Sequence, residues 1–145
     1  MNKMSCPLFV IGAGRSGTSF LSKCLDKDHR LKYNFENRYI WNYGQKNLRT
    51  DRRDKEQATQ CVKLYIRDHF EKISSEAGCV LIDKTPGNSF KLPFIFEIFP
   101  EAKVINIIRD GRANILSRQA MWGDEKKALL NLSHFRRYFR TFYNM

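Results

Sequence analysis

Short apolar runs alternate with amphipathic stretches along this 145-residue chain. Three of the runs, 7–12, 79–83 and 103–108, are almost continuously apolar, and each leads directly into a glycine-rich or charged segment. Continuous apolar runs of this length are typical of strands that are buried on both faces of a parallel sheet. The pattern therefore predicts three buried strands.

Between and after these runs, apolar residues recur at steps of three and four, as they do on one face of a helix. The predicted helices cover 18–25, 58–75, 90–99, 113–121 and 125–143. In the first of them, Phe20, Leu21, Cys24 and Leu25 are expected to form the buried face.

Two stretches do not follow either period. Residues 30–41 are mixed, and they suggest a short strand that leads into a loop or the start of a helix. Residues 44–57 are strongly charged, which is typical of a surface connection, and no chemistry is assigned to them. The order of strands and helices predicts one α/β domain over 1–145, with a mainly parallel central sheet flanked by helices.

The chain is strongly basic: it has 26 Lys and Arg residues and 15 Asp and Glu residues, which gives a net charge of +11. Such an excess favours an anionic partner: nucleic acid, a membrane surface or a phosphorylated small molecule.

Cys24, Cys61 and Cys79 lie within apolar patterns and are expected to be buried and reduced. No signal peptide is visible, and the first apolar run is far shorter than the about 20 residues that span a bilayer. The cytoplasm is the expected location.

Parallel strands end at a common edge, and ligands of α/β sheets bind beyond that edge. The segments that follow the three predicted strands carry four basic residues: Arg15, Lys84, Arg109 and Arg112. We therefore expect an anion site at this edge.

The first of these segments, Gly12–Ser19, matches two phosphate-loop patterns imperfectly. It satisfies G-x-G-x-x-G, but a dinucleotide fold needs an acidic residue at the next strand end, and Glu36 lies in a poor strand context. It also fits G-x-x-x-x-G-x-[ST], but Thr18 stands where nucleotide triphosphatases require lysine. Both patterns therefore fit less well than a third interpretation.

In that third interpretation the cation lies inside the turn, at Arg15. The backbone amides of 16–19 would form an anion-binding nest at a helix start, and Ser16, Thr18 and Ser19 would add hydroxyl donors. Arg15 could then compensate charge on a bridging phosphate oxygen. Such a loop does not need magnesium.

A second phosphate contact is predicted after the third strand. Arg109 closes that strand, and Ser117 follows eight residues later on the next helix. Two separate phosphate contacts indicate a ligand that is phosphorylated at two places, and 3′-phosphoadenosine 5′-phosphosulfate (PAPS) is such a ligand.

These motifs resemble those of the sulfotransferase family. The stretch "GAGRSGTSFL" resembles the family's 5′-phosphosulfate loop, and "VINIIRDGRANILS" resembles its 3′-phosphate element. Together with "DKTP", they are closest to the tyrosylprotein and bacterial branches. The resemblance implies a P-loop-like three-layer fold, PAPS as donor with 3′-phosphoadenosine 5′-phosphate (PAP) as product, and no metal. It also implies an acceptor hydroxyl, or less commonly an amine, which the residues do not identify as that of a tyrosyl peptide, a sugar, a lipid or a small alcohol.

The resemblance also implies a role for each matching residue. Arg15 and Lys84 would act on the transferring group, and Glu36 would activate the acceptor as general base. The residues implied in donor binding are Arg15, Ser16, Gly17, Thr18, Ser19, Arg109 and Ser117. Members of the family usually run well beyond 145 residues, so this chain is expected to be a C-terminally truncated or minimal member.

Two other function classes stay open from the sequence. A P-loop kinase or nucleotide triphosphatase would show magnesium-dependent nucleotide turnover. A basic nucleic-acid-binding module would use aromatic residues for stacking, namely Tyr33, Phe35, Tyr39 and Trp41.

Overall fold

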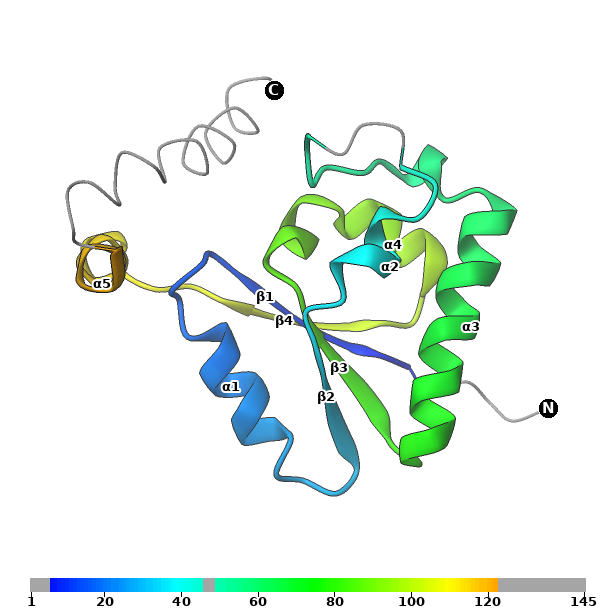
Figure 1. Cartoon of the computed structure of the whole chain (residues 1–145), viewed down its shortest axis with the longest axis horizontal. Coiled ribbons are helices and arrows are strands. Elements are labelled where there is room, and N and C mark those ends of the chain that lie inside the picture. Colours follow the sequence, from blue (N-terminus) through cyan, green and yellow to red (C-terminus); the bar gives the residue numbers. More distant parts are fainter. Residues whose placement is uncertain (1–5, 46–48, 123–145) are drawn as a thin grey trace.

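The computed structural model describes residues 6–45 and 49–122. Within them, a parallel sheet forms the middle layer of the molecule (Figure 1). Its strands are β1 (Leu8–Gly12), β2 (Leu31–Phe35), β3 (Val80–Lys84) and β4 (Lys103–Ile107). They lie in the order β2-β3-β1-β4, and every pair is parallel.

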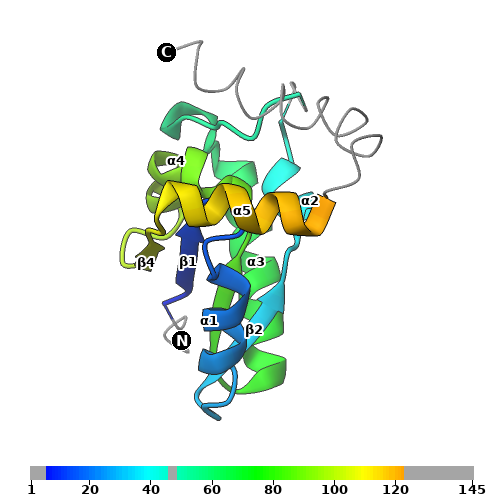
Figure 2. The same cartoon turned by 90° about the vertical axis from the view of Figure 1, so that its left-hand side faces the viewer.

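Helices cover both faces of this sheet. They are α1 (Thr18–Leu25), α2 (Arg38–Asn42), α3 (Gln60–Ala77), α4 (Leu92–Ile98) and α5 (Gly111–Trp122), with short 3₁₀ helices η1 (Lys55–Gln57) and η2 (Pro86–Phe90). Helix α1 lies on one face, α3 and α4 lie on the other, and α5 crosses the end of the sheet (Figures 1 and 2). None of the helices in the described part of the chain has the length and apolar character to cross a membrane.

The predicted fold class is confirmed, as are the three predicted strands and the first four predicted helices, with small shifts at their ends. The mixed segment 30–41 supplies both β2 and α2. Strand β2 lacks a continuous apolar run because it is an edge strand that pairs only with β3. The predicted helix 125–143 lies outside the described residues.

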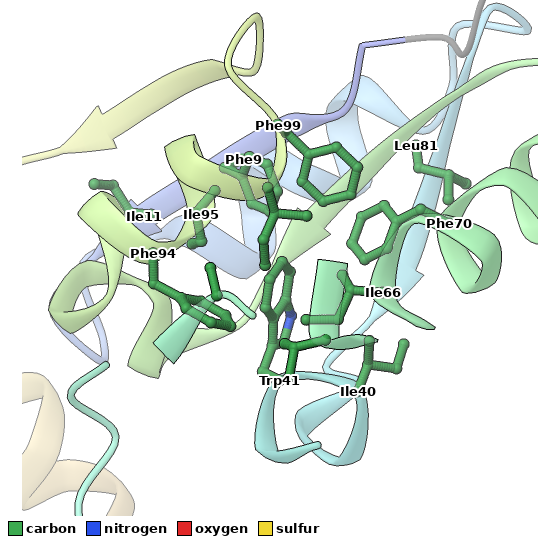
Figure 3. Close-up of a cluster of buried hydrophobic side chains, with 13 residues drawn as sticks. Phe9, Ile11, Ile40, Trp41, Ile66, Phe70, Leu81, Phe94, Ile95 and Phe99 are labelled. Carbon is green, nitrogen blue, oxygen red and sulfur yellow. The ribbon is translucent and has the colours of Figure 1, made fainter. Parts of the chain in front are cut away.

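The core lies between the sheet and helices α2, α3 and α4. Trp41 is at its centre, with ring centroids 5.7 Å from Phe9 and 5.5 Å from Phe70 in edge-to-face geometry (Figure 3). Phe9 and Leu81 contribute the sheet side of this cluster. Because neighbouring residues of a strand point to opposite faces, the buried Val10 packs on the other side, beneath α1.

The expected buried face of α1 is only partly correct, because Leu21 and Leu25 are half-buried but the other two residues are not. Phe20 is 76% exposed and Cys24 is exposed, whereas Thr18 and Ser22 are buried. The tight turn after β1 fixes the rotation of α1, and it places small polar residues against the sheet. Cys61, at the start of α3, is also exposed, so the expectation that these cysteines are buried fails for both.

The charged connection contains a buried cation that its sequence did not reveal. Arg53 is almost fully buried, and its guanidinium lies 3.9 Å from the centre of the Phe94 ring. It donates hydrogen bonds to the carbonyl oxygens of Trp41, Tyr43 and Gln57. Arg53 thus fastens the connection to the core beside α2 and α4.

Strand register decides which side chains meet at the carboxyl edge of the sheet. Gly12 is opposite Ile107 in the β1–β4 pair, so the loop after β1 and the segment after β4 leave the sheet side by side. Phe35 is opposite Lys84 in the β2–β3 pair, which brings Glu36 level with the end of β3. The edge therefore carries two neighbouring groups of residues.

Candidate donor and transfer site

The loop that joins β1 to α1 has an uncommon backbone at its centre. Arg15 has φ 69°, a left-handed conformation that residues with a side chain adopt infrequently. Gly17, at φ 104°, caps the start of α1. A residue held in such a conformation indicates that the surrounding structure constrains it.

Arg15 meets the segment that follows β4. Its carbonyl oxygen accepts a hydrogen bond of 2.8 Å from Nη1 of Arg109, and its Nε donates to Oγ of Ser117 at 3.4 Å. We call Arg15, Arg109 and Ser117 the loop cluster. The two phosphate contacts predicted from separate motifs thus open on the same side of the molecule.

The start of α1 fits a phosphate group. The first amides of a helix have no partner within the helix, and neither a side-chain cap nor an acidic residue occupies the first turn of α1. The Oγ atom of Ser16 is buried and has no hydrogen-bond partner in the described part of the chain. Thr18 is buried and Ser19 is exposed. These amides and hydroxyls have the donor chemistry that an anionic phosphate requires.

Glycine at the start of this loop is required by close packing. A Cβ atom on Gly12 would lie 2.6 Å from the carbonyl oxygen of Ile107 and 2.8 Å from Oγ of Ser16. The loop can therefore approach β4 closely only because position 12 has no side chain. This approach brings Arg15 within reach of Arg109.

The second group at the edge is an ion pair between Lys84 and Glu36. Lys84 closes β3 with only 4% of its side chain exposed, and Glu36, just after β2, is 27% exposed. We call these two residues the ion-pair cluster. Because β3 pairs with β1 in the sheet, this cluster lies next to the strand that carries the loop cluster.

A buried carboxylate, that of Asp83, directly precedes Lys84 in β3. Asp83 is fully buried and accepts hydrogen bonds from Nε1 of Trp41 at 3.0 Å and from Nδ2 of Asn88 at 2.8 Å. Burial raises the pKa of Asp83 to about 6, although both hydrogen bonds oppose the rise. Lys91 is also buried, and desolvation lowers its pKa to about 8. Through these two hydrogen bonds, Asp83 connects the end of β3, where Lys84 lies, to α2 and η2.

Arg112, the fourth basic residue expected at the edge, joins neither cluster. Its side chain is 92% exposed and lies 3.6 Å from the carboxylate of Asp110. Asp110 accepts a hydrogen bond from the amide of Ala113, and this bond keeps its pKa below the usual value. Asp110 therefore caps α5, and Arg112 faces solvent beside it.

Two residues that contact the loop were missed in the sequence. Asn114 and Arg118, on α5, both donate hydrogen bonds to the carbonyl oxygen of Gly14. Together with Ser117 they lie at helical spacing, so a polar stripe on the predicted helix was the available signal. Which element that stripe faces depends on how α5 crosses the sheet, and the sequence does not specify this.

One of the aromatic residues proposed for nucleic-acid stacking, Trp41, lies in the core and not at the surface. Trp41 has no exposed surface and donates its indole hydrogen bond to Asp83. Tyr33 is half-buried, whereas Tyr39 is exposed and contacts His69. Stacking of bases on Trp41 is therefore excluded in this fold.

Comparison with known proteins gives one family. A model described as "Sulfotransferase family" matches residues 7–145, which is nearly the whole chain. A comparison with curated proteins finds no match.

The raised pKa of Asp83 predicts a pH-dependent stability. Between about pH 4 and pH 6 the folded chain binds more protons than the unfolded chain, so the free energy of unfolding falls as the pH rises through this window. A shift from 3.8 to about 6 corresponds to about 3 kcal/mol. In Asp83→Asn the new amide can be accommodated if Asn88 turns its own amide, and this fall should disappear. Urea unfolding at several pH values measures the free energy of unfolding of the wild type and of Asp83→Asn. If this free energy changes with pH in the same way for both proteins, the raised pKa does not belong to Asp83.

Proposed function

This chain belongs to the sulfotransferase family, and on that premise we propose that it transfers a sulfuryl group from PAPS to an acceptor hydroxyl or amine. The observation that carries the proposal is the loop cluster. Arg15, on the loop that would hold the 5′-phosphosulfate, lies within hydrogen-bond distance of Arg109 and Ser117, which would hold the 3′-phosphate. A ligand with phosphates at both ends of one nucleoside suits this arrangement.

Donor binding would use the loop and the start of α1. The amides of Gly17, Thr18 and Ser19 and the buried hydroxyl of Ser16 would donate hydrogen bonds to the 5′-phosphate oxygens. Arg109 is exposed and Ser117 is half-buried, so both can turn toward a 3′-phosphate. Arginine suits this role because its planar fork donates to two phosphate oxygens at once.

The donor supplies a sulfuryl group attached to an oxygen of its 5′-phosphate. In the transfer, the bond from sulfur to that oxygen breaks while a bond from sulfur to the acceptor oxygen forms. Arg15 would compensate the negative charge that develops on the departing phosphate oxygen. Such preorganised positive charge is the main catalytic device in related phosphoryl transfers.

The ion-pair cluster would handle the acceptor proton. Glu36 would take the proton of the attacking hydroxyl, as a general base that lies at the same edge of the sheet. Lys84 holds the Glu36 carboxylate before the reaction. When the proton reaches Glu36 the pair weakens, and the Lys84 ammonium becomes available to the sulfuryl oxygens. No step assigned to these residues uses a metal ion.

Two observations count against the alternative functions. A kinase or nucleotide triphosphatase would need a lysine at position 18, where this chain has a buried threonine. A nucleic-acid-binding module that stacks bases on Trp41 would need that ring at the surface, and Trp41 is fully buried. The proposed location is the cytoplasm, whose reducing conditions suit the four free cysteines of the chain.

The first test of the proposal is nucleotide selectivity. We expect the chain to bind PAP at least tenfold more tightly than 5′-AMP, because only PAP reaches Arg109 and Ser117. Arg109→Ala should weaken PAP binding roughly tenfold to a hundredfold, the loss typical of one charge-assisted hydrogen bond. It should weaken 5′-AMP binding by less, through the lost hydrogen bond to the Arg15 carbonyl, so that most of the preference for PAP disappears. Isothermal titration calorimetry measures all four affinities.

Arg112→Ala is the matched control for this test. It removes the same charge three residues away, from a side chain that faces solvent beside Asp110. If both variants lose the same PAP affinity, PAP binding depends on the net charge of the chain and not on a specific contact with Arg109. Equal affinities of the wild type for PAP and 5′-AMP would refute the bisphosphate assignment.

The second test separates chemistry from donor binding. Glu36→Gln keeps the size of the side chain but removes the base, so we expect kcat to fall by roughly a hundredfold to ten-thousandfold. Its affinity for PAP should stay within about threefold of wild type. The measurement follows ³⁵S from labelled PAPS into a phenol, a hexose and a primary alcohol, and it uses the best of these acceptors.

Glu97→Gln provides the control, because Glu97 on α4 forms an ion pair with Lys63 on α3, and neither residue belongs to the loop cluster or the ion-pair cluster. It should leave kcat unchanged. A Glu36→Gln variant that retains wild-type kcat would remove Glu36 from the mechanism.

A further inference from the structure

The turn at Arg15 is held by side chains of another element. Arg15 is left-handed, with φ 69°, and it is the non-glycine residue with positive φ in the part of the chain that the structure describes. A backbone of this kind persists only where its surroundings fix it. The two peptide groups that flank the Cα atom of Arg15 must therefore be held in place.

Both peptide groups are held through their carbonyl oxygens. The Gly14 carbonyl accepts hydrogen bonds from Nδ2 of Asn114 at 3.0 Å and from Nη2 of Arg118 at 3.2 Å. The Arg15 carbonyl accepts from Nη1 of Arg109 at 2.8 Å. Because the first peptide plane fixes φ of Arg15 and the second fixes ψ, these donors determine its conformation.

The two donors to Gly14 are themselves connected. Nε of Arg118 donates to Oδ1 of Asn114 at 2.9 Å, so each residue orients the other across one turn of α5. Asn114 is only 9% exposed, and the guanidinium of Arg118 packs so closely on the loop that a Cβ atom on Gly14 would lie 3.3 Å from it. This pair therefore forms a rigid support under the loop.

We propose that Asn114 and Arg118 are positioning residues, which hold the Gly14 carbonyl and thereby keep Arg15 in the turn that presents its guanidinium to the donor. The proposal rests on the proposed function and assigns it two further residues. Helix α5 also carries Ser117, so one helix supports the 5′-phosphosulfate loop and contributes to the 3′-phosphate contact. Neither Asn114 nor Arg118 needs to touch the nucleotide.

The test compares Arg118→Ala with Arg112→Ala, which removes the same charge from the solvent side of the same helix. Calorimetry with PAP and with adenosine 3′-monophosphate is the readout. We expect Arg118→Ala to weaken PAP binding about tenfold and to change binding of the 3′-monophosphate less than twofold, because that ligand makes no use of the Arg15 loop. Arg112→Ala should change neither affinity more than twofold.

A double-mutant cycle shows whether Arg118 acts through Arg15. When Arg15 is already alanine, Arg118→Ala should weaken PAP binding less than threefold. Arg118→Lys, which keeps the charge and one donor, should recover part of the wild-type affinity. If Arg118→Ala does not fold, Asn114→Asp tests the same contact, since it keeps the acceptor for Arg118 but loses the donor to Gly14, and it should weaken PAP binding in the same way.

Three results would overturn the proposal: equal effects of Arg118→Ala and Arg112→Ala, equal losses for PAP and the 3′-monophosphate, or a full tenfold effect in the Arg15→Ala background. In each of these cases a wild type that prefers PAP to 5′-AMP would leave the proposed function standing. A wild type that does not bind PAP would overturn both.

Discussion

The conformation of Arg15 is the constraint on which the candidate site depends. Its left-handed backbone turns the loop so that the Gly14 and Arg15 carbonyls point toward β4 and α5, while the amides at the start of α1 remain available to an anion. The loop can take this shape only because Gly12 lets it lie close to Ile107. The segment after β4 then supplies the donors that hold it. The two predicted phosphate contacts are therefore one structural unit, although 94 residues separate Arg15 from Arg109 in the sequence.

Next to the ion-pair cluster, the chain buries two ionisable side chains. Apolar residues at these positions would be buried at a lower cost in free energy. Asp83 and Lys91 are both buried, and burial moves the pKa of each toward its neutral form. The hydrogen bonds of Asp83 to Trp41 and Asn88 fix the end of β3, and therefore the place of Lys84. Buried charge of this kind opposes stability unless it is well paired. Because Asp83 directly precedes Lys84 in β3, this buried network fits a role in holding the ion-pair cluster in place.

Much of this arrangement could be predicted from the sequence because parallel strands share an edge. The runs that became β1, β3 and β4 are apolar enough to be recognised, and the residues that follow them had to converge. Strand β2 was harder to identify, because it is an edge strand with Lys32 and Asn34 between its apolar positions. The buried face of α1 was predicted only in part, because the turn, and not the hydrophobic pattern, sets the rotation of that helix. Asn114 and Arg118 were missed for a similar reason, since their role depends on how α5 crosses the loop.

The central claim is that one adenosine nucleotide is bound at both of its phosphates by residues at neighbouring strand ends. Phosphorus NMR of PAP during titration with the protein tests this directly, because the 3′ and 5′ phosphates give separate resonances. We predict that both resonances shift and that both follow the same saturation curve. A titration in which only one of the two resonances responds would contradict the claim.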